Sequence, residues 1–317
     1  MAAEVRAQER KAADRPGKAD RPDQLDPHKL ADLGNLELVA RGVVDGFLIG
    51  LHRSPHRGFS VEFAENRAYN PGDDPRFLDW KMYARSDRLY IKQFEEETNL
   101  RAYLLLDVST SMAWTSEAGR FVSKLHYGRM LAASLTMLLA RQGDAVGLLA
   151  FDDEVRLHLH PRGSRRHVST VLSSLAGLKD GGGTDAGAAV KDVAVRLRRR
   201  GLVILISDLL VQADATLSAL RYLRHRGHEV LMLHVMDPAE LELPSAGEAV
   251  FFDPESGDEL RTNSAALRKH YREAVSEAIH EWRLEALRMG ADYHVVSTDT
   301  PLGTALGSYL QKRVRLG

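Results

Sequence analysis

From residue 100 onward the sequence alternates between short apolar runs and longer amphipathic segments, and no other feature constrains the fold as strongly. We expect strands at 102–107, 146–151, 154–159, 202–207, 229–235 and 292–297. We expect helices at 118–141, 164–176, 186–199, 212–226, 263–289 and 302–314. Such alternation is typical of proteins in which helices cover both faces of a mostly parallel sheet. The fold class predicted is therefore α/β, with a Rossmann-like sheet.

Two places depart from this alternation. Only Asp152 and Asp153 separate the expected strands 146–151 and 154–159. A parallel return requires a crossover of roughly a dozen residues, so we expect this pair to be antiparallel. Segment 237–261 interrupts the pattern and is expected to form an inserted loop or hairpin.

The chain divides into three parts by composition. Residues 1–25 carry interleaved charges and few apolar side chains, which is typical of a disordered tail. Residues 26–98 mix helical and strand patterns and are expected to form a small α+β module ahead of the sheet. Residues 99–317 are expected to form the main α/β domain.

Within the small module, the spacing of apolar residues predicts one helix and two strands. Apolar residues recur at helical spacing over 32–51, and we expect this helix to break near Gly42 or Gly46. The alternating residues of 57–66 and the apolar run 89–94 predict the strands.

The composition excludes several classes of protein. With 43 basic and 44 acidic residues the net charge is −1, which gives no support for a nucleic-acid partner. The absence of cysteine excludes disulfides, thiolate zinc sites and cysteine nucleophiles. The best membrane candidate, 131–140, is shorter than the roughly 20 residues that span a bilayer. The N-terminus lacks the apolar core of a signal peptide. We therefore expect a cytoplasmic protein without an integral membrane segment.

Three segments place hydroxyls or carboxylates at the ends of predicted strands. The first holds Asp107, Ser109 and Ser111, the second is a glycine-rich loop that reaches Thr184, and the third ends in Asp208. The carboxyl ends of parallel strands share one edge of a sheet, where α/β folds bind their ligands. Mg²⁺ prefers such hard oxygen ligands and keeps some of its water. The sequence therefore predicts a Mg²⁺ (or Mn²⁺) site built from these five residues.

The residue types indicate how each would act. Ser109 and Ser111 are two apart, so in extended backbone they point the same way. Hydroxyls are neutral ligands and leave the cation able to recruit an anion. Asp107 and Asp208 can accept hydrogen bonds from bound water or from the hydroxyls. The glycines before Thr184 allow the backbone to approach the ion closely.

This set resembles the metal-ion-dependent adhesion site of von Willebrand factor A-type domains, whose pattern is Asp-x-Ser-x-Ser, a distant Thr and a distant Asp. All five positions match. The resemblance implies that Ser109, Ser111 and Thr184 contact the metal and that Asp107 and Asp208 act largely through water. It also implies that a partner's carboxylate completes the shell. Other interpretations stay open, because Asp-x-Ser-x-Ser occurs in turns and Asp208 could cap the following helix.

A second motif precedes the first predicted strand of the main sheet and is dense in charge, aromatic side chains and turn residues. Its members are Arg67, Asp73, Asp74, Arg76, Asp79, Trp80, Arg85, Glu95, Glu96 and Glu97. It resembles the front part of the DUF58 family, and the resemblance covers roughly residues 30–310. The resemblance implies an adaptor or co-chaperone that works with a MoxR-type AAA+ ATPase.

The role of this motif has three interpretations. Bidentate pairs between its arginines and carboxylates could latch the front module onto the sheet. The same residues could form a docking face for a partner. A glutamate from Glu95–Glu97 could also bind the metal in cis and inhibit the site.

The function predicted is a non-enzymatic interaction module that binds an acidic partner residue through the metal. The alternative is a metal-dependent phosphatase or phosphotransferase with Asp107 as nucleophile. That chemistry requires a second acid two positions later, where this chain has Ser109. A phosphate-binding Gly-x-x-x-x-Gly-Lys-Ser/Thr motif is also missing from the sequence. A third option is a structural scaffold that holds no metal.

Overall fold

The main body of the protein is a six-stranded sheet covered by helices. The computed structural model describes residues 26–31, 34–53, 66–68, 80–86, 88–92, 100–117, 120–179, 181, 186–210, 213–243, 248–252 and 259–307. The strands of the sheet are β3 (Arg101–Asp107), β4 (Ala145–Phe151), β5 (Val155–Arg162), β6 (Leu202–Ser207), β7 (Glu229–Met236) and β10 (Asp292–Ser297). The predicted strands are confirmed, with ends that differ by a few residues at most.

The order of the strands in the sheet is β10-β7-β6-β3-β4-β5. All neighbouring pairs are parallel except β4 and β5, which are antiparallel as predicted. From β3 the chain moves outward to β4 and β5, then crosses to β6 on the other side of β3 and continues outward again. This is the doubly wound order of a Rossmann-like sheet, and its direction reverses between β3 and β6.

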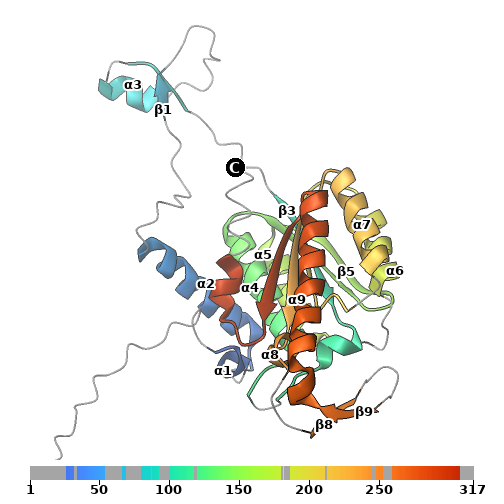
Figure 1. The fold of residues 1–317 in the computed structure, drawn as a ribbon. Helices are drawn as coiled ribbons and strands as arrows, with labels where there is room; N and C mark the ends of the chain where they lie inside the picture. The colour runs from blue at the N-terminus through green and yellow to red at the C-terminus, as the bar shows by residue number, and fades with distance from the viewer. Residues whose placement is uncertain are drawn as a thin grey trace, which may run out of the picture.

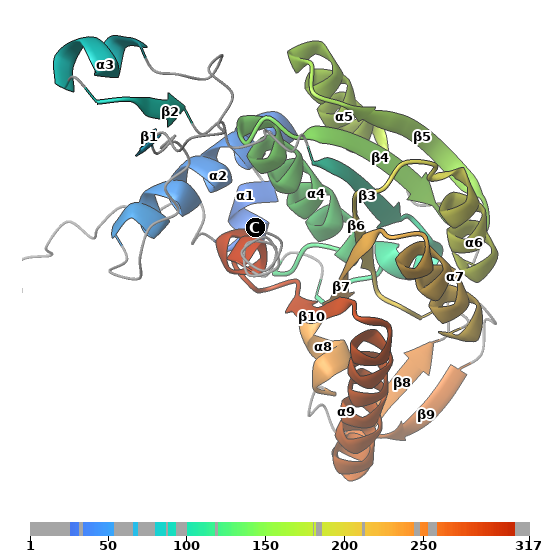
Figure 2. The ribbon, with the colours of Figure 1, turned by 90° about the horizontal axis from the view of Figure 1, so that it is seen from above.

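Helices cover both faces of the sheet, which confirms the predicted fold class (Figure 2). One face carries α4 (Lys124–Arg141) and α5 (Arg165–Gly177), and the other carries α6 (Ala186–Arg196), α7 (Ala213–His225) and α9 (Ser264–Met289). In β3, Leu104 and Leu106 pack under α4, whereas Tyr103 and Leu105 pack under α6 and α7. Because both faces of the strand are buried, its sequence is a continuous apolar run from Ala102 to Leu106 and does not alternate.

Two helices at the front of the chain share the core of the α4 face. These are α1 (Pro27–Ala31) and α2 (Leu36–Arg53), and Val43 and Val44 of α2 are completely buried there. The predicted break near Gly42 or Gly46 is wrong, because α2 is continuous through both glycines. A glycine in a helix costs about 1 kcal/mol relative to alanine, and packing of the apolar face against α4 offsets this cost.

The remaining described elements are short. β1 (Asn66–Ala68) pairs antiparallel with β2 (Tyr90–Lys92), and α3 (Trp80–Ser86) lies between them in sequence (Figure 1). This confirms part of the strand predicted at 89–94, whereas the strand predicted at 57–66 lies outside the described residues except at Asn66. The predicted domain division stays a prediction, as does the tail at 1–25, which is also outside the described residues.

The segment between β7 and α9 contains α8 (Pro238–Leu241) and an antiparallel hairpin of β8 (Glu248–Phe252) and β9 (Glu259–Asn263), as predicted. The helix predicted to begin at residue 118 begins instead at Lys124, because the side chain of Ser123 caps it by accepting a hydrogen bond from the amide of His126. The helix predicted at 302–314 is described over 302–307. Within the described residues, every helix is too short or too polar to cross a membrane.

Candidate metal centre

The direction of the chain reverses between β3 and β6, and the candidate site lies at the carboxyl ends of these two strands. Asp107 is the last residue of β3, and Asp208 directly follows Ser207, the last residue of β6. The two strands are hydrogen-bonded neighbours. The predicted meeting of Asp107 and Asp208 is therefore confirmed. We refer to Asp107, Ser109, Ser111, Ser207 and Asp208 as the strand-end site.

Asp107 is completely buried, and its hydrogen-bond donors within the described residues are uncharged groups. Its Oδ1 accepts from the amide of Ser109 at 2.9 Å and its Oδ2 from the hydroxyl of Ser207 at 2.6 Å. Burial and the nearby charge of Asp208 raise the pKa of Asp107 to about 6, although these hydrogen bonds act in the opposite direction. The ionised form of Asp107 would therefore gain from a nearby cation.

The hydroxyls of Ser109 and Ser111 lie 3.1 Å apart, so the two side chains meet, but not because the backbone is extended as predicted. Ser109 is extended, with φ −58° and ψ 162°, whereas Ser111 lies in the 3₁₀ helix η3 (Thr110–Ala113). Buried Met112 fixes this turn in the core under α4. Two adjacent ligands of octahedral Mg²⁺, each at about 2.1 Å, are about 3 Å apart. The spacing thus suits two ligands of one cation, and it also suits a hydrogen bond between the hydroxyls.

Ser207 is a member of the site that the sequence analysis did not assign. Its hydroxyl donates to Asp107 and accepts from the amide of Leu209 at 3.0 Å, so it links the ends of β3 and β6. The available signal is a hydroxyl at the last position of an otherwise apolar strand, next to an acid.

Asp208 is paired with a buried lysine, which the sequence analysis also missed. Lys124 Nζ lies 2.7 Å from Asp208 Oδ2 and 2.5 Å from Glu240 Oε1 of α8, and the side chains of Lys124 and Asp208 are both almost fully buried. Burial lowers the pKa of Lys124, but the two carboxylates outweigh this effect and leave the pKa above its ordinary value. Burial raises the pKa of Glu240. Lys124 therefore stays charged and compensates Asp208.

The turn after β6 is strained. Leu209 has φ +52°, in the left-handed region that bulky residues rarely adopt. Strain of this kind costs about 1–3 kcal/mol and is concentrated at functional sites. The turn directs the amide of Leu209 to Ser207 and the amide of Leu210 to Asp208 Oδ1, at 3.2 Å. Asp208 does not cap the next helix, because α7 begins at Ala213.

The glycine-rich loop is described only at its first residue. The amide of Gly181 donates to the carbonyl of Val108 at 2.6 Å, and its carbonyl accepts from the hydroxyl of Thr110 at 2.9 Å. A Cβ on Gly181 would lie 1.8 Å from Oδ2 of buried Asp152, so any larger residue here would force the Asp152 side chain to move. The predicted approach of the glycine-rich backbone to the ion stays a prediction. Thr184 lies outside the described residues, and its role as a ligand stays a prediction.

The turn that carries Ser111 is also tied to α8. Asp237 caps α8 by accepting from the amide of Ala239 at 2.9 Å, and its second oxygen accepts from the amide of Ser116 at 3.0 Å. Glu240 completes this capping box and holds Lys124. The loop after β3 and the turn after β6 are therefore both connected to one short helix.

The family of the chain follows from its sequence. Residues 65–281 match the profile of the family described as "Protein of unknown function DUF58". The chain belongs to the DUF58 family. An uncharacterized protein of Mycobacterium tuberculosis is 33% identical over 240 residues, which are 75% of this chain and 74% of that protein, and an uncharacterized protein of Mycobacterium bovis matches to the same extent.

Similar solved structures include the conserved hypothetical protein BatB from Bacteroides thetaiotaomicron, with a TM-score of 0.45, 18% identity and coverage of 68% of this chain and 99% of that chain. The SpRpn10 VWA domain has a TM-score of 0.37 and 9% identity, with coverage of 66% of this chain and 94% of that chain. Membership of the DUF58 family rests on the sequence matches alone.

Of the front motif of this DUF58 chain, the described residues are Arg67 in β1 and Trp80 and Arg85 in α3, where Arg85 is exposed. Asp73, Asp74, Arg76, Asp79 and Glu95–Glu97 lie outside the described residues. The three interpretations of this motif therefore stay predictions.

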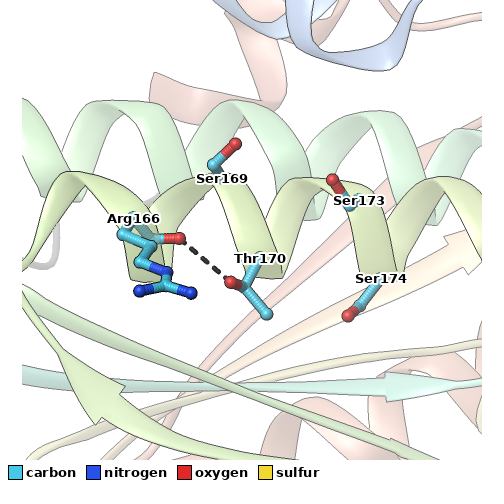
Figure 3. Close-up of a pocket in the computed structure, with 5 residues that line it drawn as sticks. All are labelled: Arg166, Ser169, Thr170, Ser173 and Ser174. Atoms are coloured by element: carbon cyan, nitrogen blue, oxygen red, sulfur yellow. Dashed lines mark hydrogen bonds between the residues drawn. The ribbon is translucent and has the colours of Figure 1, made fainter.

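A second group of hydroxyls in the DUF58 chain lines a depression of about 450 Å³ along α5 (Figure 3). Ser169 and Ser173 point to one side of the helix, and Thr170 and Ser174 point to the other. Arg166 completes the lining, and the hydroxyl of Thr170 donates to its carbonyl at 3.0 Å. The lining contains no carboxylate, so this depression has hydroxyls without the buried acids of the strand-end site.

Proposed function

We propose that this DUF58 protein is a non-enzymatic protein-interaction module that binds a carboxylate of a partner protein through Mg²⁺ or Mn²⁺. Ser109, Ser111 and Thr184 would hold the cation, and Asp107 and Asp208 would act through water. When bound, the cation supplies the positive charge to which the partner carboxylate binds. The observation that carries the proposal is the hydroxyl pair, 3.1 Å apart, next to two buried carboxylates at the reversal point of the sheet.

The chemistry of these donors fits a divalent cation. Burial, and after it the charge of Asp208, raise the pKa of Asp107, and a nearby cation would favour its ionised form. Both oxygens of Asp208 already accept hydrogen bonds, from Lys124 and from the amide of Leu210, which favours a role through water. Among the described residues, no group of three or more His, Asp or Glu side chains could hold a metal ion. A cation at the strand-end site would therefore depend on hydroxyl ligands.

The burial of Asp107 favours binding over catalysis. A nucleophilic carboxylate must reach the substrate, whereas Asp107 is fully buried and both of its oxygens are held by Ser109 and Ser207. Ser111, in contrast, is only partly buried, so its side of the site is open to a partner. In a phosphatase assay with and without Mg²⁺, the wild type should show no more turnover than Asp107→Asn. Turnover in the wild type that is lost in Asp107→Asn would favour the alternative, a phosphatase or phosphotransferase.

Within the cell, we propose that the partner is a MoxR-type AAA+ ATPase and that the protein works with it in the cytoplasm as an adaptor or co-chaperone. Support comes from the resemblance of the front motif, which includes Arg67, Trp80 and Arg85, to that of the DUF58 family, and from the family match over residues 65–281. Binding to a purified MoxR-type ATPase should be lost in EDTA and in Ser111→Ala.

Thermal unfolding in Mg²⁺, Mn²⁺ or EDTA tests the metal directly. A ligand that binds only the folded state stabilises it, by about 2.7 kcal/mol at a hundred times its Kd. We expect Mg²⁺ or Mn²⁺ to raise the Tm of the wild type and to have no such effect on Ser111→Ala. The matched control is Ser173→Ala, which removes an exposed hydroxyl from α5 (Figure 3) and should respond like the wild type. Equal responses in all three proteins would contradict the proposal.

A further inference from the structure

Two large apolar side chains are exposed at the edge of the strand-end site. Trp114, which directly follows η3, is 40% exposed, and Leu210, in the turn after β6, is 62% exposed. Most large apolar side chains near the ends of β3 and β6 are buried, including Met112 and Leu209. Aromatic side chains such as Trp114 are enriched in protein interfaces relative to the rest of the surface.

Trp114 is held in place by the site itself. Its amide donates to the carbonyl of Ser111 at 3.3 Å, and its carbonyl accepts from the amide of Lys124 at 3.3 Å. The ammonium of Lys124 lies 5.9 Å from the centre of the indole ring and 2.7 Å from Asp208. The ring is therefore fixed next to the charged groups.

The exposure of Leu210 follows from the strained turn. Leu209 is 5% exposed and packs in the core under α6 and α7, whereas Leu210 points to solvent. The positive φ of Leu209 makes this arrangement possible. Glycine or asparagine would adopt that φ at lower cost, but neither would fill the core position. The strain thus buries one leucine and presents the next at the edge of the site.

Trp114 and Leu210 lie on the two loops that leave the strand-end site, one after β3 and one after β6. The loop after β3 leads to the α4 face, where Met112 is buried, and the turn after β6 leads to the face covered by α6 and α7, where Leu209 is buried (Figure 2). The backbone of each loop also contacts the site, since the amide of Trp114 donates to the carbonyl of Ser111 and the amide of Leu210 donates to Asp208 Oδ1.

We propose that Trp114 and Leu210 form the apolar part of the partner site, and that the partner segment presents an acidic residue flanked on both sides by large apolar residues. This inference rests on the proposed function, because the acid would bind the cation. The ligands support an anionic partner: the hydroxyls of Ser109 and Ser111 are neutral, so a divalent cation held by them keeps its charge on the open side of the site. Tryptophan is also among the residues that contribute most to interfaces.

The test compares three synthetic peptides, blocked at both ends, for binding to the full chain in Mg²⁺ by NMR titration. They are Leu-Gly-Glu-Gly-Leu, Gly-Gly-Glu-Gly-Gly and Leu-Gly-Gln-Gly-Leu. The leucines stand two positions from the acid, so in an extended peptide they point to the same side as it does. We expect the first peptide to bind roughly tenfold more tightly than the second. The glutamine peptide should not bind, and EDTA should abolish all binding.

Two variants assign the preference to the proposed surface. Trp114→Ala and Leu210→Ala should each reduce the preference for leucine severalfold, measured as the ratio of the affinities for the two glutamate peptides within each variant. Leu287→Ala is the matched control, because Leu287 is 73% exposed on α9, and it should keep the full preference.

Two results would overturn the inference in distinguishable ways. Equal Mg²⁺-dependent affinity for both glutamate peptides, or a preference unchanged in both variants, would reject the apolar surface and leave the proposed function standing. No Mg²⁺-dependent binding of either glutamate peptide would reject the proposed function and this inference with it.

Discussion

The ends of β3 and β6 carry carboxylates that are equally shielded from water, but the two are stabilised in different ways. Asp107 is 0% exposed and accepts hydrogen bonds from an amide and a hydroxyl. Asp208 is 2% exposed and forms an ion pair with Lys124, which also binds Glu240. One buried acid is thus solvated by dipoles and the other is compensated by a full charge.

This difference bears on where the proposed cation would bind. A buried carboxylate without a counter-charge is costly, and the raised pKa of Asp107 reflects that cost. Asp208 has its counter-charge inside the protein. A positive ligand therefore gains more from the end of β3 than from the end of β6, and the Ser109–Ser111 pair lies on that side.

The largest expected effect comes from removing the counter-charge of Asp208. Lys124→Met keeps the length of the side chain but leaves Asp208 and Glu240 buried without their cation. Breaking one partner of a buried ion pair costs about 3–5 kcal/mol. We expect a loss of this size in the free energy of unfolding, measured by urea denaturation at neutral pH.

Glu240→Gln is the control for this prediction. It leaves the ion pair of Lys124 with Asp208 intact and so should cost less than Lys124→Met. The double variant Lys124→Met with Asp208→Asn should regain part of the lost stability, because it removes the uncompensated charge at the site. If Lys124→Met were as stable as the wild type, Asp208 would not depend on Lys124 for its counter-charge, and the contrast between the carboxylates of β3 and β6 would be wrong.

The next effect is a dependence of stability on pH that comes from Asp107 alone. Its pKa is raised to about 6 in the folded protein, so between pH 4 and 6 the folded state holds this proton more tightly than the unfolded chain. The contribution of Asp107 to the free energy of unfolding therefore falls as pH rises through this window, by on the order of 3 kcal/mol in total. Urea denaturation in EDTA across this range measures it.

Asp107→Asn isolates this contribution, since asparagine does not titrate. The stability of the wild type minus that of the variant should fall as pH rises and level off above pH 6 to 7. Mg²⁺ should reduce the fall if the cation favours the ionised acid. A difference that is constant from pH 4 to 7 would show that Asp107 does not have a raised pKa.

Sequence patterns located the strands and their polar ends because these signals are local. The run 202–207 is apolar at each position until Ser207, and an acid follows directly, so the end of β6 and the position of Asp208 could be predicted. The shared edge of the parallel sheet then placed Asp208 near Asp107, although no local feature connects them.

The missed features depend on contacts between distant segments. Lys124 lies in an apolar stripe of α4, and its partners Asp208 and Glu240 are 84 and 116 residues away in sequence. Only the folded chain shows that they meet. The sequence predicts extended backbone at Ser111, whereas the structure has a 3₁₀ turn there. Burial of Met112 under α4 decides this conformation, and that contact is not visible in the local sequence. The unbroken α2 likewise follows from packing and not from its glycines.

The smallest expected effect comes from the hydroxyl that solvates Asp107. Ser207→Ala removes the donor to Asp107 and the acceptor of the Leu209 amide. A buried group left without its hydrogen bond costs about 1–3 kcal/mol, so we expect a loss of roughly 2 kcal/mol by urea denaturation. Ser134→Ala is the matched control, because this buried hydroxyl only donates to the carbonyl of Met130 within α4, and its removal should cost much less. If both variants lose the same stability, the hydroxyl of Ser207 has no special role in stabilising Asp107, and the contrast between the two strand ends would reduce to the ion pair of Asp208.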